Sequence, residues 1–434
     1  MLPEALQMAK GVRDFGPEEK IERDRIVQIL KRVFESFGYN PIETPVLERY
    51  ELFASKYGIG MESDAMRETF KLKDQGGRDL VLRTEFTVPF SRFVAMNPQL
   101  RKPFKRYQMG TVFRDGPIKL GRYREFWQCD VDVVGVGNPA IDAEILQLAQ
   151  EAFSQLGLEV EIRINNRKIL NGILQYAGVS AEAELSAIIA IDKLDKIGPE
   201  GVKTELQKRG VADKSIDTIV ELITIQGSNN DIITKLRAKL GDNEGLREVE
   251  RTVRYVVDGE NILVLPSLAR GLAYYTGNVF EVYLKNRATL SSSVGAGGRY
   301  DEMIAGFLKS NQPYPAVGIS FGLETIFDAI KLLKQDGQSP KSVVQVYVSP
   351  FSQEYIPKAM EIAAALRRAT VRVDVDYLSR KLKKNLEHAS VYQIPWVVIL
   401  GDNEIEQEKV MLRNMRTGEQ ALLAMDEVIK TINK

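Results

Sequence analysis

The chain is poor in the residues that many enzymes use for metal binding or nucleophilic catalysis. Its 434 residues include one cysteine, Cys129, and one histidine, His388. A single cysteine excludes an intrachain disulfide and a zinc site built from cysteines. A single histidine excludes His-rich metal sites and argues against a Ser–His–Asp triad. We therefore interpret both residues as structural, and we expect no metal site built from protein ligands.

Long apolar runs and an excess of charge of one sign are also missing. Lys+Arg and Asp+Glu both number 59, and this balance still permits a local basic patch for nucleic acid. No uninterrupted apolar stretch reaches the length of a membrane span, and the N-terminal MLPEALQMAKGVRDF lacks a signal-peptide core. The composition, 44% hydrophobic and 27% charged, is typical of a globular protein with two or three domains. We expect a cytoplasmic protein with no membrane partner.

The first and longest part of the chain has the pattern of an antiparallel sheet. Apolar residues at helical spacing predict a helix that Gly38 ends, and a second helix is predicted over Ala140–Leu156. Short apolar runs joined by turns follow the first helix, namely ETFKLKD, DLVLRTEFTVPFSRFVA, RYQMGTVFRDG and FWQCDVDVVGVG. Runs of this kind favour neighbouring antiparallel strands over a doubly wound parallel sheet.

Two further parts have different textures. Within residues 167–254 the apolar residues fall at helical spacing, so we predict a helical insertion that interrupts a catalytic domain of residues 1–166 and 255–333. After the polar linker KQDGQSPK, strands and helices alternate over residues 342–434. This alternation predicts a compact α/β domain with a largely parallel sheet.

Three arginines stand in segments suited to an anionic ligand. The segment LARGLAYYTGNVFE places Arg270 beside the pair Tyr274–Tyr275, a combination that suits a polar ring next to an anionic reacting group. Arg114 and Arg122 flank a loop with glycines and a proline, and a guanidinium pairs bidentately with phosphate oxygens. A surface ion pair is the simpler explanation for any one arginine. A polyanion site explains the three together better.

Polar residues on apolar strands provide candidates for the rest of a pocket. Gln128, Asp130 and Asp132 alternate and therefore share one face, which either meets solvent or lines a pocket. Asp132 could accept an N–H from a ligand ring, and Gln128 could bind a ligand carboxylate. Glu85 and Thr87 could hold an ammonium group, or Glu85 could form an ordinary salt bridge. The glycines of VGAGGRYD leave backbone room for a flat ligand, although this motif alone is weak.

Several of these segments resemble those of one family. KGVRDFGPEE, GYNPIETPVLE, FRDGPIKLGRYREFWQCD and AVGISFGLE resemble, in order, the N-terminal signature and motifs 1, 2 and 3 of histidyl-tRNA synthetases. ARGLAYYTG is similar to their histidine-binding signature, and IDKLDKIG to their helical insertion. The resemblance covers nearly the whole chain. It implies a class II catalytic domain with an antiparallel six-stranded sheet, a helical insertion and a C-terminal α/β anticodon-binding domain.

The resemblance also implies an activity and partners. These are the ligation of L-histidine to tRNA(His) through a histidyl-adenylate, with ATP and Mg²⁺, by a homodimer built partly on the motif 1 segment. Arg114 and Arg270 would be catalytic at the α-phosphate, and Arg122 would contact the ATP phosphates. The residues implied for histidine are Glu85, Thr87, Gln128, Asp132, Tyr274 and Tyr275. If Tyr274 and Tyr275 lie on a strand, only one of them would touch histidine directly.

The chain departs from the family pattern at three positions near these residues, of which Thr84, in place of a usual proline, is a minor change. Ala273 stands where an aspartate is usual, which removes a carboxylate from the support of the pocket. Thr325 stands where motif 3 usually has an arginine that contacts ATP, and Arg299 is the cation that could compensate. A non-catalytic relative in the same family, the regulatory subunit of ATP phosphoribosyltransferase, is therefore the alternative. A tRNA-binding scaffold without chemistry is a third hypothesis, against which the retained arginines argue.

The surface for tRNA is the least defined by the sequence. Four cations gather at the start of a predicted C-terminal helix and two more lie near the end of the chain: Arg380, Lys381, Lys383, Lys384, Arg413 and Arg416. Contacts from such a patch to phosphates would add affinity with little sequence information. A solvated helix face explains each residue equally well.

Overall fold

The chain folds into two compact units. The computed structural model describes residues 6–57, 67–270, 274–287, 290–311, 313–333 and 340–433. One unit comprises residues 1–13 and 26–333, and the other comprises residues 14–25 and 334–434. The helical segment 167–254 falls within the first unit, so its separation as a domain of its own stays a prediction. Within the described ranges, no helix is long and apolar enough to cross a membrane.

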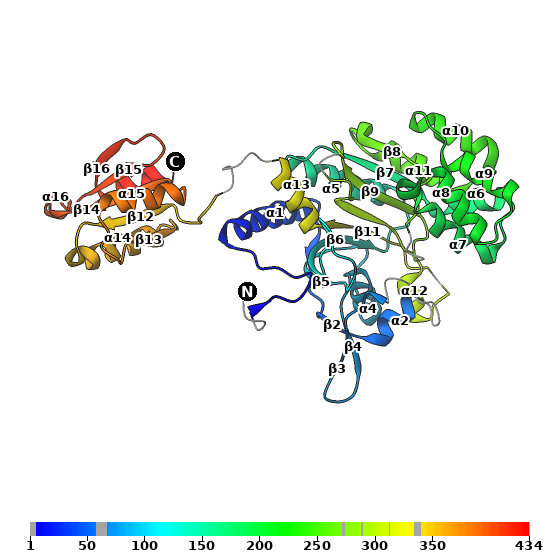
Figure 1. Ribbon diagram of the computed structural model, residues 1–434, viewed down its shortest axis with the longest axis horizontal. Coiled ribbons are helices and arrows are strands. Elements are labelled where there is room, and N and C mark those ends of the chain that lie inside the picture. The colour runs from blue at the N-terminus through cyan, green and yellow to red at the C-terminus, as the bar shows by residue number, and fades with distance from the viewer. Residues whose placement is uncertain are drawn as a thin grey trace. The chain divides into compact units, whose positions relative to one another are not determined.

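A sheet of eight strands forms the centre of the first unit (Figure 1). In spatial order the strands are β1 (Asn40–Pro41), β5 (Phe104–Phe113), β6 (Glu125–Val134), β11 (Ala316–Gly322), β10 (Gly295–Arg299), β9 (Asn278–Leu284), β7 (Val160–Asn166) and β8 (Ile262–Val264). The six inner strands are antiparallel throughout, and each edge strand pairs in parallel with its neighbour. The antiparallel catalytic sheet is confirmed, and the short parallel edge strands are an addition to it.

Helices supply the apolar layer that covers one face of this sheet. The helices of this layer are α1 (Pro17–Ser36), α5 (Ala140–Gln155) and α13 (Leu323–Leu333). The ring of Phe34 lies 5.4 Å from that of Phe321 on β11, and the ring of Phe153 on α5 lies 5.5 Å from the same ring. Gly38 adopts a positive φ of 80° directly after α1, which confirms the predicted end of that helix.

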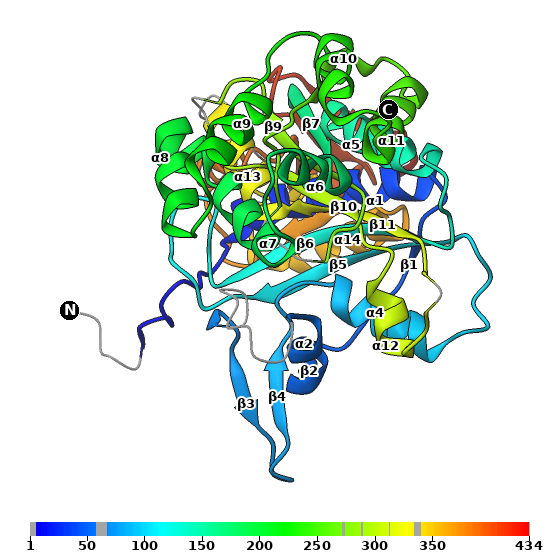
Figure 2. The same cartoon turned by 90° about the vertical axis from the view of Figure 1, so that its right-hand side faces the viewer.

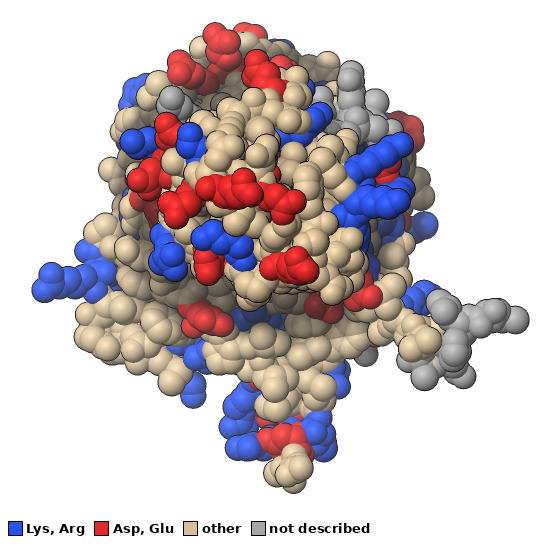
Figure 3. Space-filling model, turned by 90° about the vertical axis from the view of Figure 1, so that its left-hand side faces the viewer, with Lys and Arg blue, Asp and Glu red and all other residues tan. Residues whose placement is uncertain are grey.

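A second, smaller group of elements in this unit has a hydrophobic cluster of its own. Its elements are β2 (Leu47–Arg49), α2 (Tyr50–Tyr57), β3 (Lys71–Lys73), β4 (Asp79–Leu82), α4 (Thr87–Met96) and α12 (Met303–Leu308). The three strands form a sheet of their own, and the β3–β4 hairpin projects from the unit (Figure 2). Figure 3 shows lysine and arginine side chains on both sides of this hairpin, around an acidic one. Ion pairs join Lys73 to Asp79 and Arg78 to Asp74.

One apolar run in this group is a helix, where the sequence analysis expected part of the sheet. Residues Thr87–Met96 form α4. The carboxylate of Glu85 accepts the backbone N–H groups of Thr87 and Val88, which satisfies two of the donors at the start of the helix. Pro89 lies in this first turn, where a proline is tolerated because its missing N–H would have no helical partner. The expectation of strand here was wrong because the acidic cap outweighs the β-rich composition.

Six helices form the insertion between β7 and β8. They are α6 (Arg167–Tyr176), α7 (Ala181–Ile191), α8 (Leu194–Lys208), α9 (Asp213–Ile223), α10 (Asn229–Leu240) and α11 (Glu244–Tyr255). They lie together on the side of the unit away from the hairpin (Figure 2). Their buried residues, such as Ile188, Ile219 and Leu246, belong to the same hydrophobic core as the sheet. The helical character predicted for residues 167–254 is therefore confirmed.

The second unit contains an α/β fold with its own five-stranded sheet. Its strands, in spatial order, are β13 (Val373–Val375), β12 (Val346–Pro350), β14 (Trp396–Leu400), β15 (Val410–Asn414) and β16 (Gln420–Leu423). Its helices are α14 (Ile356–Arg368), α15 (Leu382–Val391), α16 (Asp402–Glu406) and α17 (Met425–Ile432). The α/β class is confirmed, but only the first three strands are parallel.

The antiparallel pair β15–β16 comes from a tight turn. Asn414 accepts the backbone N–H groups of Arg416 and Thr417, and Gly418 adopts a positive φ of 79°. This turn chemistry joins β15 to β16 as a hairpin. The ring of His388 on α15 packs at a tilt against those of Tyr347 and Tyr392, with ring separations of 4.9 Å and 4.6 Å. These contacts agree with a structural role for the histidine.

Candidate functional site

A polar cavity of about 210 Å³ lies on the face of the central sheet opposite the helical layer. Strands β10 and β11 supply its floor, and β6, the start of α4 and the loop before β9 supply its walls. Eight of the predicted site residues line it: Glu85, Thr87, Arg114, Gln128, Asp132, Arg270, Tyr274 and Tyr275. Arg122 and Arg299 do not line it. Segments far apart in the sequence therefore meet at one site.

The polar residues of β6 form one wall of the cavity. The residues Gln128, Asp130 and Asp132 all line it. The face that they share therefore lines a pocket and does not meet solvent as an open strand surface. Gln128 donates its amide N–H to the Ser320 hydroxyl over 2.7 Å. The amide oxygen of Gln128 and the Oδ1 atom of Asp130 are buried and have no hydrogen-bond partner in the protein. Both atoms can accept a hydrogen bond from a ligand.

Asp132 is held by two side chains that the sequence analysis did not identify. Arg106 on β5 forms a 2.6 Å ion pair with its carboxylate, and the Tyr300 hydroxyl donates to Oδ1. The guanidinium of Arg106 lies 4.3 Å above the ring of Phe90, so it is completely buried between an aromatic face and Asp132. Arg106 stands between Lys105 and Tyr107 in the predicted strand, and no motif in the sequence marks it for this role.

Burial sets the acid–base properties of this wall. Burial raises the pKa of Asp132 to about 6, against the opposing effects of Arg106 and Tyr300. Burial raises the pKa of Asp130 to about 7, again opposed by Arg106, and the neighbouring Asp132 raises it further. Two titratable carboxyl groups therefore share one buried cation. Raised pKa values of this kind are common at functional sites.

Glycines on the floor make room for side chains of the site. A Cβ on Gly318 would lie 1.9 Å from the Oδ1 atom of Asp132, so only glycine allows the carboxylate its position. A Cβ on Gly298 would lie 2.8 Å from the ring of Tyr275. The glycines of VGAGGRYD were expected to leave room for a flat ligand. At Gly298 that room holds the ring of Tyr275.

The tyrosine pair lies in a loop before β9. The rings of Tyr274 and Tyr275 are 4.5 Å apart with an interplanar angle of 40°, and both line the cavity. The premise that they alternate on a strand does not hold, because these two residues precede the strand. Ala273, the departure noted just before them, lies outside the described residues.

Arg270 occupies a well-supported position on the cavity wall. Its guanidinium donates to Glu281 on β9 over 2.5 Å, and the Tyr283 hydroxyl donates to the same carboxylate over 2.6 Å. Burial lowers the pKa of Arg270, but Tyr275 and Glu281 more than offset this and raise the pKa above its ordinary value. Arg270 therefore presents a permanent positive charge to the cavity. Glu281 and Tyr283 were not identified from the sequence.

Arg114 and Glu85 meet at the start of α4. Arg114 donates from Nε to the backbone carbonyl of Thr84 over 3.0 Å, and its guanidinium lies 5.3 Å from the ring of Phe126. This contact leaves the two terminal nitrogens of the guanidinium fork for other acceptors. Glu85 lines the cavity while its carboxylate caps α4, so it serves the helix as well as the site.

Thr325 lies against the loop that carries Arg122. Arg122 is exposed, and its backbone pairs with that of Lys119 across the loop. The hydroxyl of Thr325 donates to the carbonyl of Gly322. Its methyl group lies close to Gly121, where an added Cβ would approach it to 2.9 Å. The position at which an arginine was expected therefore faces the loop that carries Arg122.

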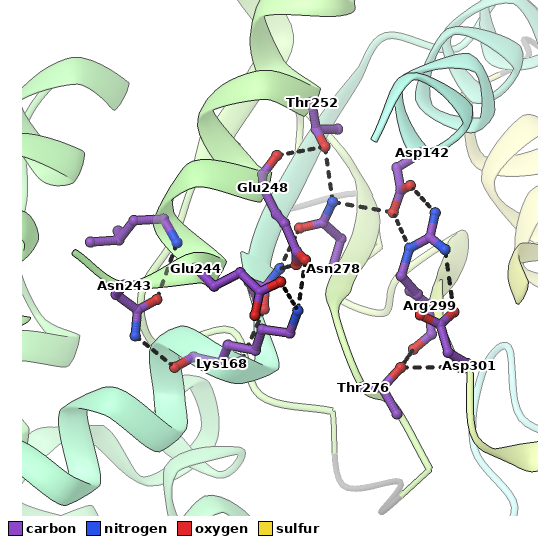
Figure 4. Close-up of polar contacts among 12 residues, drawn as sticks. Asp142, Lys168, Asn243, Glu244, Glu248, Thr252, Thr276, Asn278, Arg299 and Asp301 are labelled. Carbon is purple, nitrogen blue, oxygen red and sulfur yellow. Dashed lines mark hydrogen bonds and ion pairs between the residues drawn. The ribbon is translucent and has the colours of Figure 1, made fainter. Parts of the chain in front are cut away.

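Arg299 lies behind the cavity floor in a buried polar network (Figure 4). Its guanidinium donates to both oxygens of Asp142, to Asp301 over 3.2 Å and to the carbonyl of Val136 over 3.1 Å. All of these partners belong to the protein itself. Sequence analysis placed Arg299 among the ATP ligands, but the structure does not bring it to the cavity with the other residues.

The fold and the cavity together define the class of the protein. A cavity with two arginines and several polar side chains lies on an antiparallel sheet, and a separate α/β unit follows it in the chain. This arrangement agrees with the class of aminoacyl-tRNA synthetases, which the motifs in the sequence resemble.

Comparisons with known proteins identify the family within this class. The family model described as histidyl-tRNA synthetase matches residues 11–326, and that described as anticodon binding domain matches residues 345–434. Histidine--tRNA ligase 1 of Bacillus thuringiensis subsp. konkukian is 41% identical over 98% of this chain and 99% of its own. Histidine--tRNA ligase of Aeropyrum pernix is 37% identical over 98% and 97%. The chain belongs to the histidyl-tRNA synthetase family.

Solved structures agree with this assignment. The crystal structure of histidyl-tRNA synthetase from Nostoc sp. PCC 7120 superposes with a TM-score of 0.85 at 32% identity, covering 99% of each chain. A protein of Bacillus halodurans described as an ATP phosphoribosyltransferase regulatory subunit/histidyl-tRNA synthetase gives a TM-score of 0.75 at 24% identity. It covers 92% of this chain and 98% of its own. At that identity the second likeness concerns the fold alone.

Proposed function

We propose that the chain ligates L-histidine to tRNA(His) in two steps, with histidyl-adenylate as the intermediate and ATP as the energy source. Family membership over residues 11–326 supports the reaction. The observation that carries the proposal is the cavity, because one wall presents partners for a ring and Arg114 and Arg270 present cations for a phosphate. The partners for the ring would select the amino acid, and the cations would neutralise the phosphate that its carboxylate attacks.

In the first step, the carboxylate of histidine attacks the α-phosphorus of ATP, a new C–O–P link forms, and pyrophosphate leaves with the electrons of the broken P–O bond. Arg114 and Arg270 would neutralise the charge on the α-phosphate, and Arg122 would bind the departing phosphates. Mg²⁺ would enter with ATP as part of the substrate. In-line transfer of this kind depends on positioning and charge neutralisation more than on proton transfer. The absence of histidine from this part of the chain is therefore no obstacle.

Residues of β6, of the tyrosine loop and of the start of α4 would select the amino acid. Asp132 would accept the N–H of one ring nitrogen, and the Tyr275 hydroxyl, with Tyr274 beside it, would bond the other nitrogen. The amide oxygen of Gln128, which has no partner in the protein, suits a hydrogen-bond donor of the amino acid. One N–H of the same amide donates to Ser320, and the other suits the carboxylate. Glu85 and Thr87 would hold the α-ammonium group. A pocket that bonds each ring nitrogen rejects analogues that lack one, by about 10⁴–10⁵-fold.

In the second step, the terminal adenosine of tRNA(His) would take the histidyl group from the adenylate. The C-terminal unit, which matches an anticodon binding domain, would bind the tRNA. Lys381, Lys383 and Lys384 are exposed at the start of α15 and suit phosphate contacts. We also propose a cytoplasmic homodimer. Val46 and Leu47, in the motif 1 segment, remain 40% and 49% exposed in the single chain, which supports an interface there.

A regulatory, non-catalytic role is the alternative, since a relative of that description shares the fold. The presence of Arg114 and Arg270 in the cavity favours catalysis. Isotope exchange between pyrophosphate and ATP separates the two roles, because exchange requires reversible formation of an adenylate. We expect the pure protein to exchange only when histidine is added. Exchange that histidine does not stimulate would sink the proposed function.

A further inference from the structure

Gly298, Arg299 and Tyr300, at the end of β10, lie alternately toward the cavity and toward the polar network behind it. Gly298 packs against the ring of Tyr275, and Tyr300 meets the ring of Tyr274 edge-on at 6.2 Å. Side chains alternate along a strand, so Arg299 between them points away from the cavity, into the network of Figure 4. Gly298 and Tyr300 therefore contact the tyrosine rings, and Arg299 between them lies on the other side of the strand.

The loop that carries the tyrosines is attached to Arg299 through its next two residues. Thr276 donates its backbone N–H to the carbonyl of Arg299 over 2.8 Å. The Thr276 hydroxyl accepts the backbone N–H of Asp301 over 3.0 Å. A Cβ on Gly277 would lie 2.9 Å from the Cδ atom of Arg299, so the loop packs directly on the arginine side chain. The position of Arg299 thus determines where the loop can lie.

Arg299 itself is fixed by the carboxylate of Asp142, which lies in the first turn of α5. Asn278 also donates to this carboxylate over 3.1 Å, and to the Thr252 hydroxyl on α11 over 2.9 Å. A buried charge pair with additional hydrogen bonds holds its members in one geometry, and removing one partner leaves the other unpaired.

The network continues into the insertion. Asn166 donates to the side-chain oxygen of Asn278 and to Glu248 on α11, and Lys168 donates to Glu248 over 2.7 Å (Figure 4). The backbone N–H of Arg167, at the start of α6, donates to the carbonyl of Gly277 over 2.9 Å. The loop after the tyrosines is therefore bonded to β10 on one side and to the first helix of the insertion on the other.

We propose that Arg299 is a positioning residue for amino-acid binding, which holds the Tyr274–Gly277 loop so that Tyr274 and Tyr275 meet the ring of the bound histidine. The inference rests on the proposed function for the identity of that ring. It assigns Arg299 to the amino acid half of the site and replaces the nucleotide role considered for it from the sequence. Asp142 and Thr276 are its partners in this role.

The test compares Michaelis constants for the two substrates in pyrophosphate exchange. Arg299→Lys keeps the charge but loses the planar fork that spans Asp142 and Asp301. Thr276→Val removes the acceptor for Asp301 with little change of volume, and Thr276→Ser restores it. The Thr276 hydroxyl also donates to the carbonyl of Arg299 over 3.4 Å. Thr204→Val is the matched control, because the Thr204 hydroxyl likewise donates to a backbone carbonyl, on an exposed turn of α8.

We expect Arg299→Lys and Thr276→Val to raise the KM for histidine about tenfold and to leave the KM for ATP within about twofold. Thr276→Ser and Thr204→Val should resemble the parent protein. A raised KM for ATP with an unchanged KM for histidine would overturn the assignment, as would no change in either constant. If Arg299→Lys fails to fold, the Thr276 pair gives the same decision.

This outcome can be separated from failure of the proposed function. Exchange by the parent protein in the presence of histidine tests the proposed function alone. If the parent protein exchanges with histidine and the two constants do not separate in the variants, the positioning role is wrong while the activity stands. If the parent protein shows no histidine-dependent exchange, direct titration with histidine still measures whether Thr276→Val weakens binding relative to Thr276→Ser. Equal binding by these two variants would overturn the positioning role.

Discussion

The two halves of the cavity differ in how completely the protein supports them. On the side proposed for histidine, Asp132 has Arg106 and Tyr300 as partners, and Tyr275 packs on Gly298. On the side proposed for the phosphates, Arg114 has one bond to a backbone carbonyl through Nε, and Arg122 is exposed on a loop. The amino acid half is built before any ligand arrives. Apart from Arg270, which is paired with Glu281, the nucleotide half consists of cations with open donor positions.

This difference corresponds to what each half must recognise. Selection of one amino acid requires fixed donors and acceptors, because an imprecise pocket cannot reject a close analogue. Binding of a triphosphate requires charge, which acts over a longer range and tolerates movement of the side chain. Substitutions in the amino acid half should therefore act on histidine and depend on geometry. Those in the nucleotide half should act on ATP and depend on charge.

The largest effect is expected where the two halves meet, at Arg270. Arg270→Ala should lower the rate of pyrophosphate exchange by about 10³-fold or more, because a fixed cation at the reacting phosphate is lost. Glu281 keeps the hydroxyl donor of Tyr283, so the protein should remain folded, as a thermal melt can check. Near-normal exchange in this variant would remove Arg270 from the reaction.

A glycine tests the precision of the amino acid half. Gly318→Ala should displace the carboxylate of Asp132, which an added Cβ would meet at 1.9 Å. We expect the KM for histidine to rise about 100-fold with little change in the KM for ATP, measured by exchange. Gly306→Ala on α12 is the control, because its added Cβ meets no atom within 4 Å. Equal behaviour of the two variants would contradict the assignment of Asp132.

A charge tests the nucleotide half. Arg122→Ala should raise the KM for ATP about fivefold at low salt, the size expected for one exposed ion pair in water. The difference from the parent protein should shrink as salt is added, because exposed charges are screened. The KM for histidine should not change. A change confined to histidine would reverse the assignment of the two halves.

The last test concerns the dependence of stability on pH, at the buried carboxyl group of Asp130. The folded-state pKa of Asp130, about 7, lies above the ordinary value near 3.9, so the folded protein binds the proton more tightly than the unfolded chain. The cost of the buried charge is present above that pKa and is relieved as the pH falls through it. Asp130→Asn should therefore stabilise the protein most at about pH 8, with a gain that declines toward about pH 5. Chemical unfolding at several pH values measures it, and a constant gain would contradict the raised pKa.

The sequence was sufficient to predict eight of the residues that line the cavity. Strand alternation placed Gln128 and Asp132 on one face, and motif order brought Arg114 and Arg270 to the same site. These predictions succeeded because spacing within a strand and a long motif are local properties of the chain.

The supporting partners could not be predicted in this way. Arg106, Tyr300 and Glu281 act through contacts between strands that are distant in sequence, so their roles depend on register. The same reason accounts for Arg299, which neighbours cavity residues in sequence but points to the other face of its strand. Residues Thr87–Met96 resembled a strand because the cap provided by Glu85 depends on the geometry at the start of the helix.

The most direct test of the account is a crystal structure of the protein with histidine and a non-hydrolysable ATP analogue bound together. The account predicts the imidazole ring between Asp132 and Tyr275, with the α-phosphate between Arg114 and Arg270. A ring bound elsewhere in the cavity, or a phosphate that contacts Arg299 in place of Arg270, would contradict it.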